Sequence, residues 1–198
     1  MEDHMPQTTF HLPPFSRDSR GNRLLRWQAM NESGGHVLWL CGPSEVVDQL
    51  IGAVPEYTPL PLSAEATRRW THSLRARGPL RSDVASLLEL LTTVVSLPSP
   101  PNIDTAIALD WYKVPQEGVD AQEWLNTEMA KLVRQGKYLN QFNARRQADA
   151  GLELVARLCN AIRSHTGLGH ATIILDVPGH DSERVSFGSR VASSVARH

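Results

Sequence analysis

The sequence predicts a mixed α/β fold, in which an incomplete sheet with flanking helices follows a smaller, mainly helical region. Two observations predict the sheet: one continuous apolar run at residues 36–41 and another at 171–177. Apolar runs of strand length are typical of strands covered on both faces, as in α/β sheets. Apolar residues spaced by three and four over 82–96 and 143–165 predict helices with a core-facing side.

The first part of the chain divides into an arm and a small region. Residues 1–22 are polar, contain prolines and lack periodicity, so we expect a flexible N-terminal arm. Residues 23–100 are expected to form a small α/β or mainly helical region. There, Pro43 follows the first strand and suits the first position of a helix. A serine cap and a basic end predict a further helix over 63–77.

A second region, 101–198, follows the proline-rich run at 97–102, which stops helix formation. Its predicted elements are a strand of about seven residues within 103–115, a helix from Asp120 to Arg134, a helix from Asn143 to His165, a strand over 171–177 and a final helix from Phe187 to His198. That final helix has no glycine or proline stop after it.

Composition excludes several classes of function. The 198 residues are 41% hydrophobic and carry a formal net charge of −1, so no general excess of positive charge favours nucleic acid or an anionic membrane. Neither a signal peptide nor a run long enough to span a bilayer is present. Cys41 and Cys159 lie in separate apolar runs and are interpreted as small buried hydrophobes, which favours a reducing, cytoplasmic setting.

The polar loop after the strand at 171–177 is the candidate binding site. Loops at the C-terminal ends of strands in α/β sheets present free backbone N–H groups, which bind anions. Pro178 fixes the exit from the strand, and Gly179 permits a ligand to approach the backbone. Ser182, Ser186 and Gly188 supply further N–H groups. The alternative is a plain strand-to-helix connection in which Asp181 or Ser186 caps the last helix.

Other reactive residues favour structural interpretations. The spacing of His165, His170, His180 and Asp181 matches no standard metal site, so the histidines are interpreted as surface or loop residues. Cys41 has no base placed near it by sequence. Four aromatic residues are interpreted as core or interface packing, although they also suit stacking on a nucleobase: Trp111, Tyr112, Trp124 and Tyr138.

A family resemblance adds to these observations. The segments "LVRQGKYLNQFNARRQADAGLELVARLCNAI" and "ATIILDVPGHDSERVSFGSRVASSVA" make residues 125–198 resemble the first part of a type I phosphoribosyltransferase, of the competence-associated and amidophosphoribosyl types. The resemblance implies a phosphoribosyltransferase-like sheet and Mg²⁺ bridging the diphosphate of phosphoribosyl diphosphate. The implied diphosphate-binding residues are Val177, Pro178, Gly179, His180, Asp181 and Ser182.

The sequence also departs from that family. It lacks the strand that ends in paired acidic residues and a Thr/Gly-rich loop, and residues 185–189 replace the Arg-Gly-Phe-Asn-Gln of competence-type members. We therefore expect a truncated N-terminal portion, ended by a frameshift or premature stop or completed by a separately encoded half, and inactive alone. A partner chain or a homo-oligomer would complete the fold. The alternative function is a non-enzymatic α/β interaction or regulatory module, in which the apolar face of "VASSVA" docks on a partner.

Overall fold

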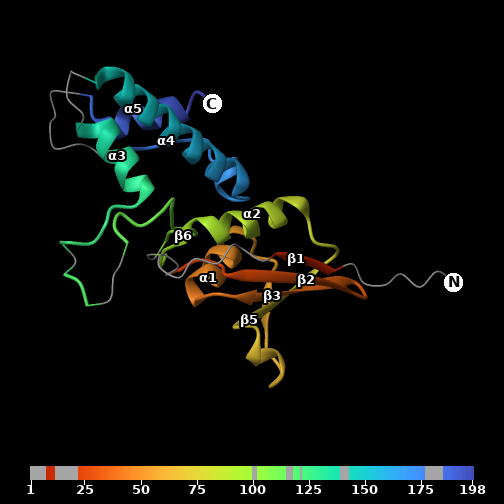
Figure 1. The fold of residues 1–198 in the computed structure, drawn as a ribbon. Helices are drawn as coiled ribbons and strands as arrows, with labels where there is room; N and C mark the ends of the chain where they lie inside the picture. The colour runs from red at the N-terminus through yellow and green to blue at the C-terminus, as the bar shows by residue number, and fades with distance from the viewer. Residues whose placement is uncertain are drawn as a thin grey trace. The chain divides into compact units, whose positions relative to one another are not determined.

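Two compact units make up the chain (Figure 1). One comprises Met1–Ala108 with His165–Gly167, and the other comprises Leu109–Ser164 with Leu168–His198. The computed structural model describes residues 8–11, 22–99, 102–114, 118–120, 122–138, 143–176 and 185–198. Helices and antiparallel sheets are both present, so the predicted mixed α/β class is confirmed.

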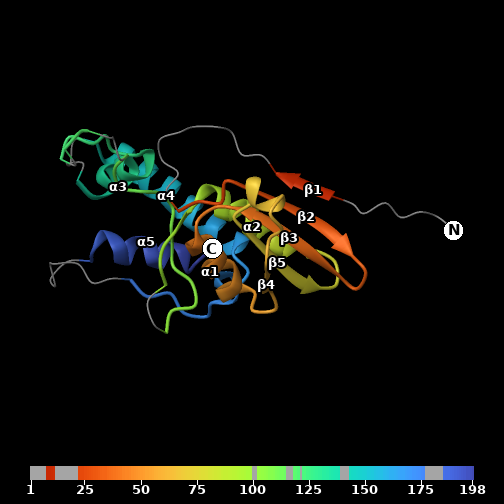
Figure 2. The same ribbon diagram turned by 90° about the horizontal axis from the view of Figure 1, so that it is seen from below.

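A five-stranded antiparallel sheet forms the first unit, in the order β1-β2-β3-β5-β4 (Figure 2). Its strands are β1 (Thr8–His11), β2 (Arg26–Glu32), β3 (Gly35–Cys41), β4 (Thr58–Leu60) and β5 (His72–Arg77). The β2–β3 hairpin turns at Gly34, whose φ of 80° suits glycine. The sheet thus lies before residue 100. Strand β1, which belongs to the region expected to be a flexible arm, pairs with β2.

Alternating side chains build the core of this unit. Trp27 on β2, Leu38 on β3 and Leu74 on β5 are almost fully buried. The helices α1 (Ser44–Ala53) and α2 (Ser82–Thr93) supply the facing residues, which include Val46, Leu50, Leu87, Leu88 and Leu91. Figure 1 shows α2 along one face of the sheet. Each fully buried side chain of this kind stabilises the fold by about 1.5–3 kcal/mol.

The predicted helix over 63–77 is wrong. Only Ala66–Arg68 form a short 3-10 turn, and the residues from His72 onward form β5. Within β5, Leu74 and Ala76 are buried while Arg75 and Arg77 are exposed, which is the period of a strand. Pairing with β3 and β4 on both sides outweighs the helical end signals.

Shorter elements close the first unit. The helix predicted over 82–96 ends at Thr93, because Val95–Ser96 form strand β6. Strand β6 pairs with β7 (Ile107–Ala108), so the seven-residue strand expected there is reduced to two residues.

The described residues of the second unit form three α-helices: α3 (Glu128–Tyr138), α4 (Ala144–Ser164) and α5 (Phe187–Val195). The helix predicted from Asn143 to His165 is confirmed as α4, within one residue at each end. The helix predicted from Asp120 begins later, because the Asp120 carboxylate accepts a hydrogen bond from Gln122 N in a local turn. Thr127 caps α3 instead, since its Oγ1 accepts from Ala130 N at 3.1 Å.

The strand predicted over 171–177 is wrong for the residues that the structure describes. Residues 171–176 form no strand and are all exposed, with Ile173 at 73% and Leu175 at 87% of their full exposure. An apolar run becomes a buried strand only where neighbouring strands and covering helices exist, and the described part of this unit offers three helices. The phosphoribosyltransferase-like sheet expected in residues 101–198 is therefore not formed by the described residues.

A buried polar network belongs to the first unit. Gln49 on α1 is fully buried, and its Oε1 accepts from Thr105 Oγ1 at 2.5 Å and from Ala106 N at 2.6 Å. Thr105 Oγ1 also lies 3.0 Å from His165 Nε2. His165 is fully buried in the bend that follows α4, so it is a loop residue, as expected, and not a surface residue.

The network fixes where the imidazole holds its proton. Gly167 N donates to His165 Nδ1 at 3.1 Å, so Nδ1 carries a lone pair and Nε2 carries the hydrogen. Nε2 then donates to Thr105, whose hydroxyl donates to Gln49. Burial lowers the pKa of His165 below its ordinary value. A second proton would face the Gly167 N–H, which disfavours the charged form.

We predict that the first unit loses stability in mild acid through His165. The unfolded chain binds the second proton near pH 6.5, before the folded protein does, so the free energy of unfolding falls as the pH drops from about 7 through about 6. Below the lowered folded pKa the loss stops. Urea unfolding of the wild type and of His165→Gln over this range measures the effect, and the free-energy gap between them should shrink with falling pH. The exposed His170→Gln variant is the control, and a gap that stays constant would contradict the prediction.

Candidate functional site

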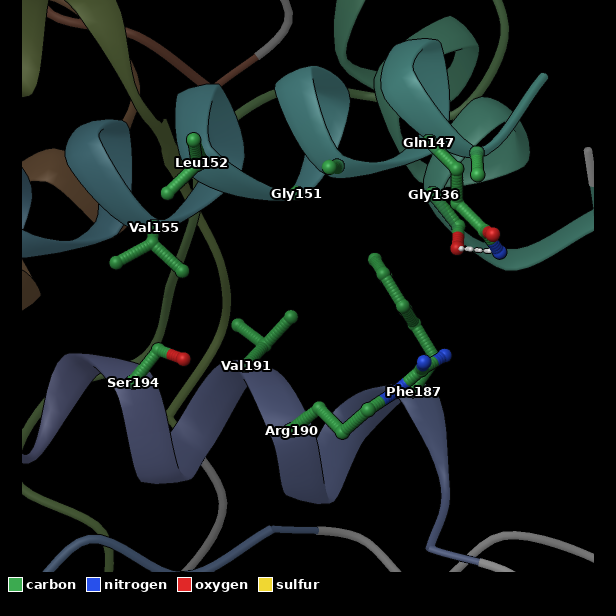
Figure 3. Close-up of a pocket in the computed structure, with 11 residues that line it drawn as sticks. Gly136, Gln147, Gly151, Leu152, Val155, Phe187, Arg190, Val191 and Ser194 are labelled. Carbon is green, nitrogen blue, oxygen red and sulfur yellow. Dashed lines mark hydrogen bonds between the residues drawn. The ribbon is translucent and has the colours of Figure 1, made fainter.

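An apolar groove runs between α4 and α5 (Figure 3). Gln147 and Phe187 lie at one end, and Val155 and Ser194 lie at the other, so the two helices run in the same direction. The lining positions on α5 recur with the helical period: Phe187, Arg190, Val191 and Ser194. The small residues Ala144, Ala148 and Gly151 line it from α4. The groove encloses about 390 Å³, which lies within the range of ligand-binding pockets.

At the end of the groove near Val155, α4 and α5 pack directly against each other. Val155 and Cys159 on α4 and Val195 on α5 form a buried cluster, against which Leu158, Ile162 and Val191 pack. On the apolar face of "VASSVA", Val195 and, in part, Val191 therefore pack against α4. Docking of this face on a partner stays a prediction. Burial of Cys159 confirms its interpretation as a small hydrophobe.

At the other end, three helices meet around the Phe187 ring. The ring points toward Gly136 on α3 (Figure 3), and a Cβ built at Gly136 would lie 2.6 Å from two of its carbons. Gln147 on α4 donates from Nε2 to the Gly136 carbonyl at 3.0 Å. Glycine at 136 thus lets the aromatic ring approach the α3 backbone, and the contact holds the start of α5 away from α4.

Gly151 leaves the middle of the groove open. A Cβ added there would meet no atom within 4 Å. Leu152 beside it is 68% exposed, although it is a large apolar residue in the middle of α4. The groove therefore offers apolar surface that the described residues do not cover.

A serine cap positions the start of α5. Ser186 Oγ accepts from Ser189 N at 3.0 Å, which satisfies one of the free N–H groups of the first turn. The Ser189 hydroxyl donates to the Asp176 carboxylate, so the end of the exposed segment is tied to α5. The capping role that the sequence suggested for Ser186 is thus confirmed.

Arg190 lines the Phe187 end of the groove, and its guanidinium lies 5.9 Å from the Phe187 ring centroid. Arg190 is exposed and has no ion-pair partner within the part of the chain that the structure describes. Lys137 and Arg145 follow the groove residues Gly136 and Ala144 in the sequence, but neither lines the groove. Lys137 Nζ lies 5.0 Å from the centroid of the Tyr138 ring.

Exposed apolar side chains are concentrated in the second unit. Of the large hydrophobic residues that are exposed in the described ranges, all but Ile103 belong to it. They include Leu152, Leu125, Ile173, Leu175 and Val185, together with the tyrosines Tyr112 and Tyr138. Core packing is therefore excluded for these two tyrosines, and the interface packing that was expected as its alternative stays a prediction.

A charged cleft of about 940 Å³ lies at the end of the sheet in the first unit. Most of its charges are already paired. Arg75 contacts Glu32 at 2.8 Å, and Arg81 contacts both Glu56 and Asp83 at 2.8 Å. The hydrogen bond from Arg81 lowers the pKa of the Asp83 carboxyl. A ligand there would have to break existing ion pairs.

Beside that cleft, a histidine and a tyrosine form a buried pair. His36 Nε2 lies 2.6 Å from the Tyr57 hydroxyl, and His36 Nδ1 lies 2.8 Å from the Gly78 carbonyl. Since a carbonyl only accepts, Nδ1 donates to Gly78 and Nε2 accepts from Tyr57. Burial, and then the Glu56 carboxylate, raises the pKa of Tyr57 well above its ordinary value. The pair anchors the Gly78 turn and is closed to solvent.

The six residues proposed for diphosphate binding lie outside the described residues: Val177, Pro178, Gly179, His180, Asp181 and Ser182. His165 lies in the core of the first unit, and His170 is exposed in the short 3-10 turn Leu168–His170. No group of three or more metal-ligating side chains occurs in the ranges that the structure describes. Cys41 is half-buried and free.

Sequence reasoning missed the groove, although a signal for it exists. Phe187, Val191 and Ser194 follow the helical period, and the small residues of α4 follow it too. Small residues on one helix opposite larger ones on another indicate close but incomplete packing. The contact of Gly136 with Phe187 joins residues far apart in sequence, so no local pattern reveals it.

Substitution by alanine should change stability differently at the two glycines beside the groove. We predict that Gly151→Ala raises the free energy of unfolding of the helical unit by about 0.5–1 kcal/mol, because its added Cβ meets only open space in a helix interior. Gly136→Ala should give no such gain, because the Phe187 ring must move. Urea unfolding followed by far-UV circular dichroism measures both variants, and equal gains would contradict the contact.

Comparisons with protein-family models, with curated proteins and with solved structures find no match for this chain. Among the helices in the described ranges, none combines the length and the apolar character that crossing a membrane requires. The groove between α4 and α5 is therefore the feature from which a function is proposed.

Proposed function

We propose that the protein is a non-enzymatic interaction module, whose second unit binds a helical segment of a partner protein in the groove between α4 and α5. The open apolar groove carries the proposal. The exposed Leu152 and the space beside Gly151 provide contact surface for apolar side chains. Concentration of exposed hydrophobic residues in the same unit supports a binding role for it.

Backbone chemistry favours a helix over an extended segment as the occupant. Both walls of the groove are α-helices, whose N–H and C=O groups are paired along their own axes. Such walls offer no strand edge, so an extended peptide would lose water from its backbone without gaining partners. A helix satisfies its own backbone and presents side chains alone. Helix α5 has nine residues and is about 13.5 Å long, which matches about two and a half turns of a bound helix.

The expected phosphoribosyltransferase function stays a prediction with its own test. Its expected diphosphate loop lies outside the described residues. Residues 171–176, which were expected to form the strand before that loop, form no strand. Under the interaction proposal, calorimetric titration with phosphoribosyl diphosphate and Mg²⁺ should show no heat of binding. Heat that disappears in a Gly179→Trp variant would instead favour the transferase interpretation and count against ours.

A neutral helical peptide tests the groove directly. The probe is an amphipathic peptide of about 18 residues with leucines at i, i+3, i+4 and i+7 and a glutamine and serine polar face. We predict that it shifts the methyl NMR signals of Leu152, Val155 and Val191. Gly151→Phe should abolish these shifts, because the new ring fills the open space in the groove.

The matched control for that variant is Ala156→Phe, which adds the same ring at an exposed position of α4 outside the groove lining. It should leave binding unchanged. Binding that survives Gly151→Phe, or a complete absence of shifts in the wild type, would contradict the proposed function.

A further inference from the structure

We infer that residues 171–175 pair as an antiparallel strand with the same residues of a second copy of this chain, which makes the protein a weak homodimer. None of these residues lines the groove, so the inference goes beyond the proposed function and does not depend on it. The observation that carries it is a run of exposed residues, 171–176, which has large aliphatic side chains and no secondary structure.

The backbone of this segment is unpaired. Ala171 N donates to the Leu168 carbonyl, and no other backbone N–H or C=O group of 171–176 has a partner among the described residues. Thr172, Ile173 and Ile174 are β-branched, which favours a strand over a helix. The described part of this unit contains no strand that could pair with them. A strand from outside the chain would satisfy these backbone groups and remove aliphatic surface from water.

Exposure already alternates along the segment. Ile173 and Leu175 are 73% and 87% exposed, whereas Ile174 between them is 40% exposed. Residues two apart share a face of a strand, so Ile173 and Leu175 belong to the outward face. Asp176 shares the other face with Ile174, and its carboxylate accepts a hydrogen bond from the Ser189 hydroxyl of α5. That face is therefore turned toward the helical unit, and support from a helix stabilises a two-stranded pair that would be marginal alone.

The segment complements itself in one antiparallel register. If Ile173 lies opposite Ile173 of the second copy, Ala171 lies opposite Leu175 at each end, where a small residue faces a large one. His170 then lies opposite Asp176 of the second copy. Its imidazole donates to Asp176 Oδ1, which has no hydrogen bond within the described residues, since only Oδ2 is bonded to α5. A parallel pair in register would instead bring the two Asp176 carboxylates together.

Charge complementarity thus selects the antiparallel pair and identifies the occupant as a second copy. A twofold axis passes beside Ile173, so the contact is the same on both copies and closes as a dimer. Five residue pairs form a contact well below the size of a stable interface, so the dimer should be weak.

Sedimentation velocity of the intact protein tests the pairing. We expect a monomer at about 1 µM and a growing fraction of dimer toward about 100 µM, as is typical of a small, transient contact. Ile173→Asp should weaken dimerisation about tenfold or more, because two carboxylates would then face each other at the twofold axis. Ile173→Lys should weaken it for the same reason. An equimolar mixture of the two variants should dimerise again, because opposite charges then meet.

The matched control is Leu125→Asp. Leu125 is 66% exposed in the same unit and lies outside the segment, so this variant should keep the wild-type dimer. Circular dichroism verifies that all variants keep their helices.

A monomer at every concentration up to about 300 µM would overturn the inference, because even a weak contact dimerises there, and would leave the segment to a strand of another protein. A dimer that survives Ile173→Asp, one that Leu125→Asp weakens equally, a mixture of the two variants that stays monomeric, or an open series of larger oligomers would overturn it too. The neutral helical peptide described above keeps the two proposals apart. Absence of its binding contradicts the proposed function and leaves the dimer standing, whereas a monomer that binds it contradicts the dimer alone.

Discussion

Contact between the Phe187 ring and the Gly136 backbone determines the shape of the second unit. It places the aromatic end of α5 against α3, while Val195 at the other end of α5 packs on α4. Helix α5 is held at both ends in this way, and its middle leaves an open groove against α4. The open space beside Gly151 is the direct result, since no atom lies within 4 Å of a Cβ at that position. The groove thus depends on two glycines. Gly136 lets the Phe187 ring approach the α3 backbone, and Gly151 has no side chain to fill the space between α4 and α5.

Periodicity predicted the elements whose signal was local and strong. The helices α2 and α4, and the strand at 36–41, were found at or near their observed bounds because each repeats its apolar residues over several turns or in one short run. Asp120 misled the prediction, because its carboxylate serves a turn and Thr127 supplies the cap of α3. End signals for a helix at 63–77 failed because β5 is decided by pairing with β3 and β4, which no local pattern encodes.

The segment at 171–176 shows the limit of reasoning from apolar content. Isoleucine and leucine in succession favour a buried strand, but burial requires neighbours, and Ile173 and Leu175 remain exposed. For the candidate site, the sequence identified Ser186 as a cap, yet the groove depends on contacts between residues up to about fifty positions apart. Such contacts become visible only once the helices are placed.

The two units differ in how many large apolar side chains they expose. Both contain polar groups without partners among the described residues, such as the buried Arg26 Nε and Ser96 Oγ of the first unit. In the first, Gln49, Thr105 and His165 complete one another's hydrogen bonds, and Arg81 is neutralised by Glu56 and Asp83. In the second, large apolar side chains face solvent, and Arg190 at the groove has no ion-pair partner within the described residues. Binding stabilises most where apolar surface and charge are still uncompensated. The proposed recognition of a partner therefore rests on the helical unit, where most of the exposed large apolar side chains of the described residues lie.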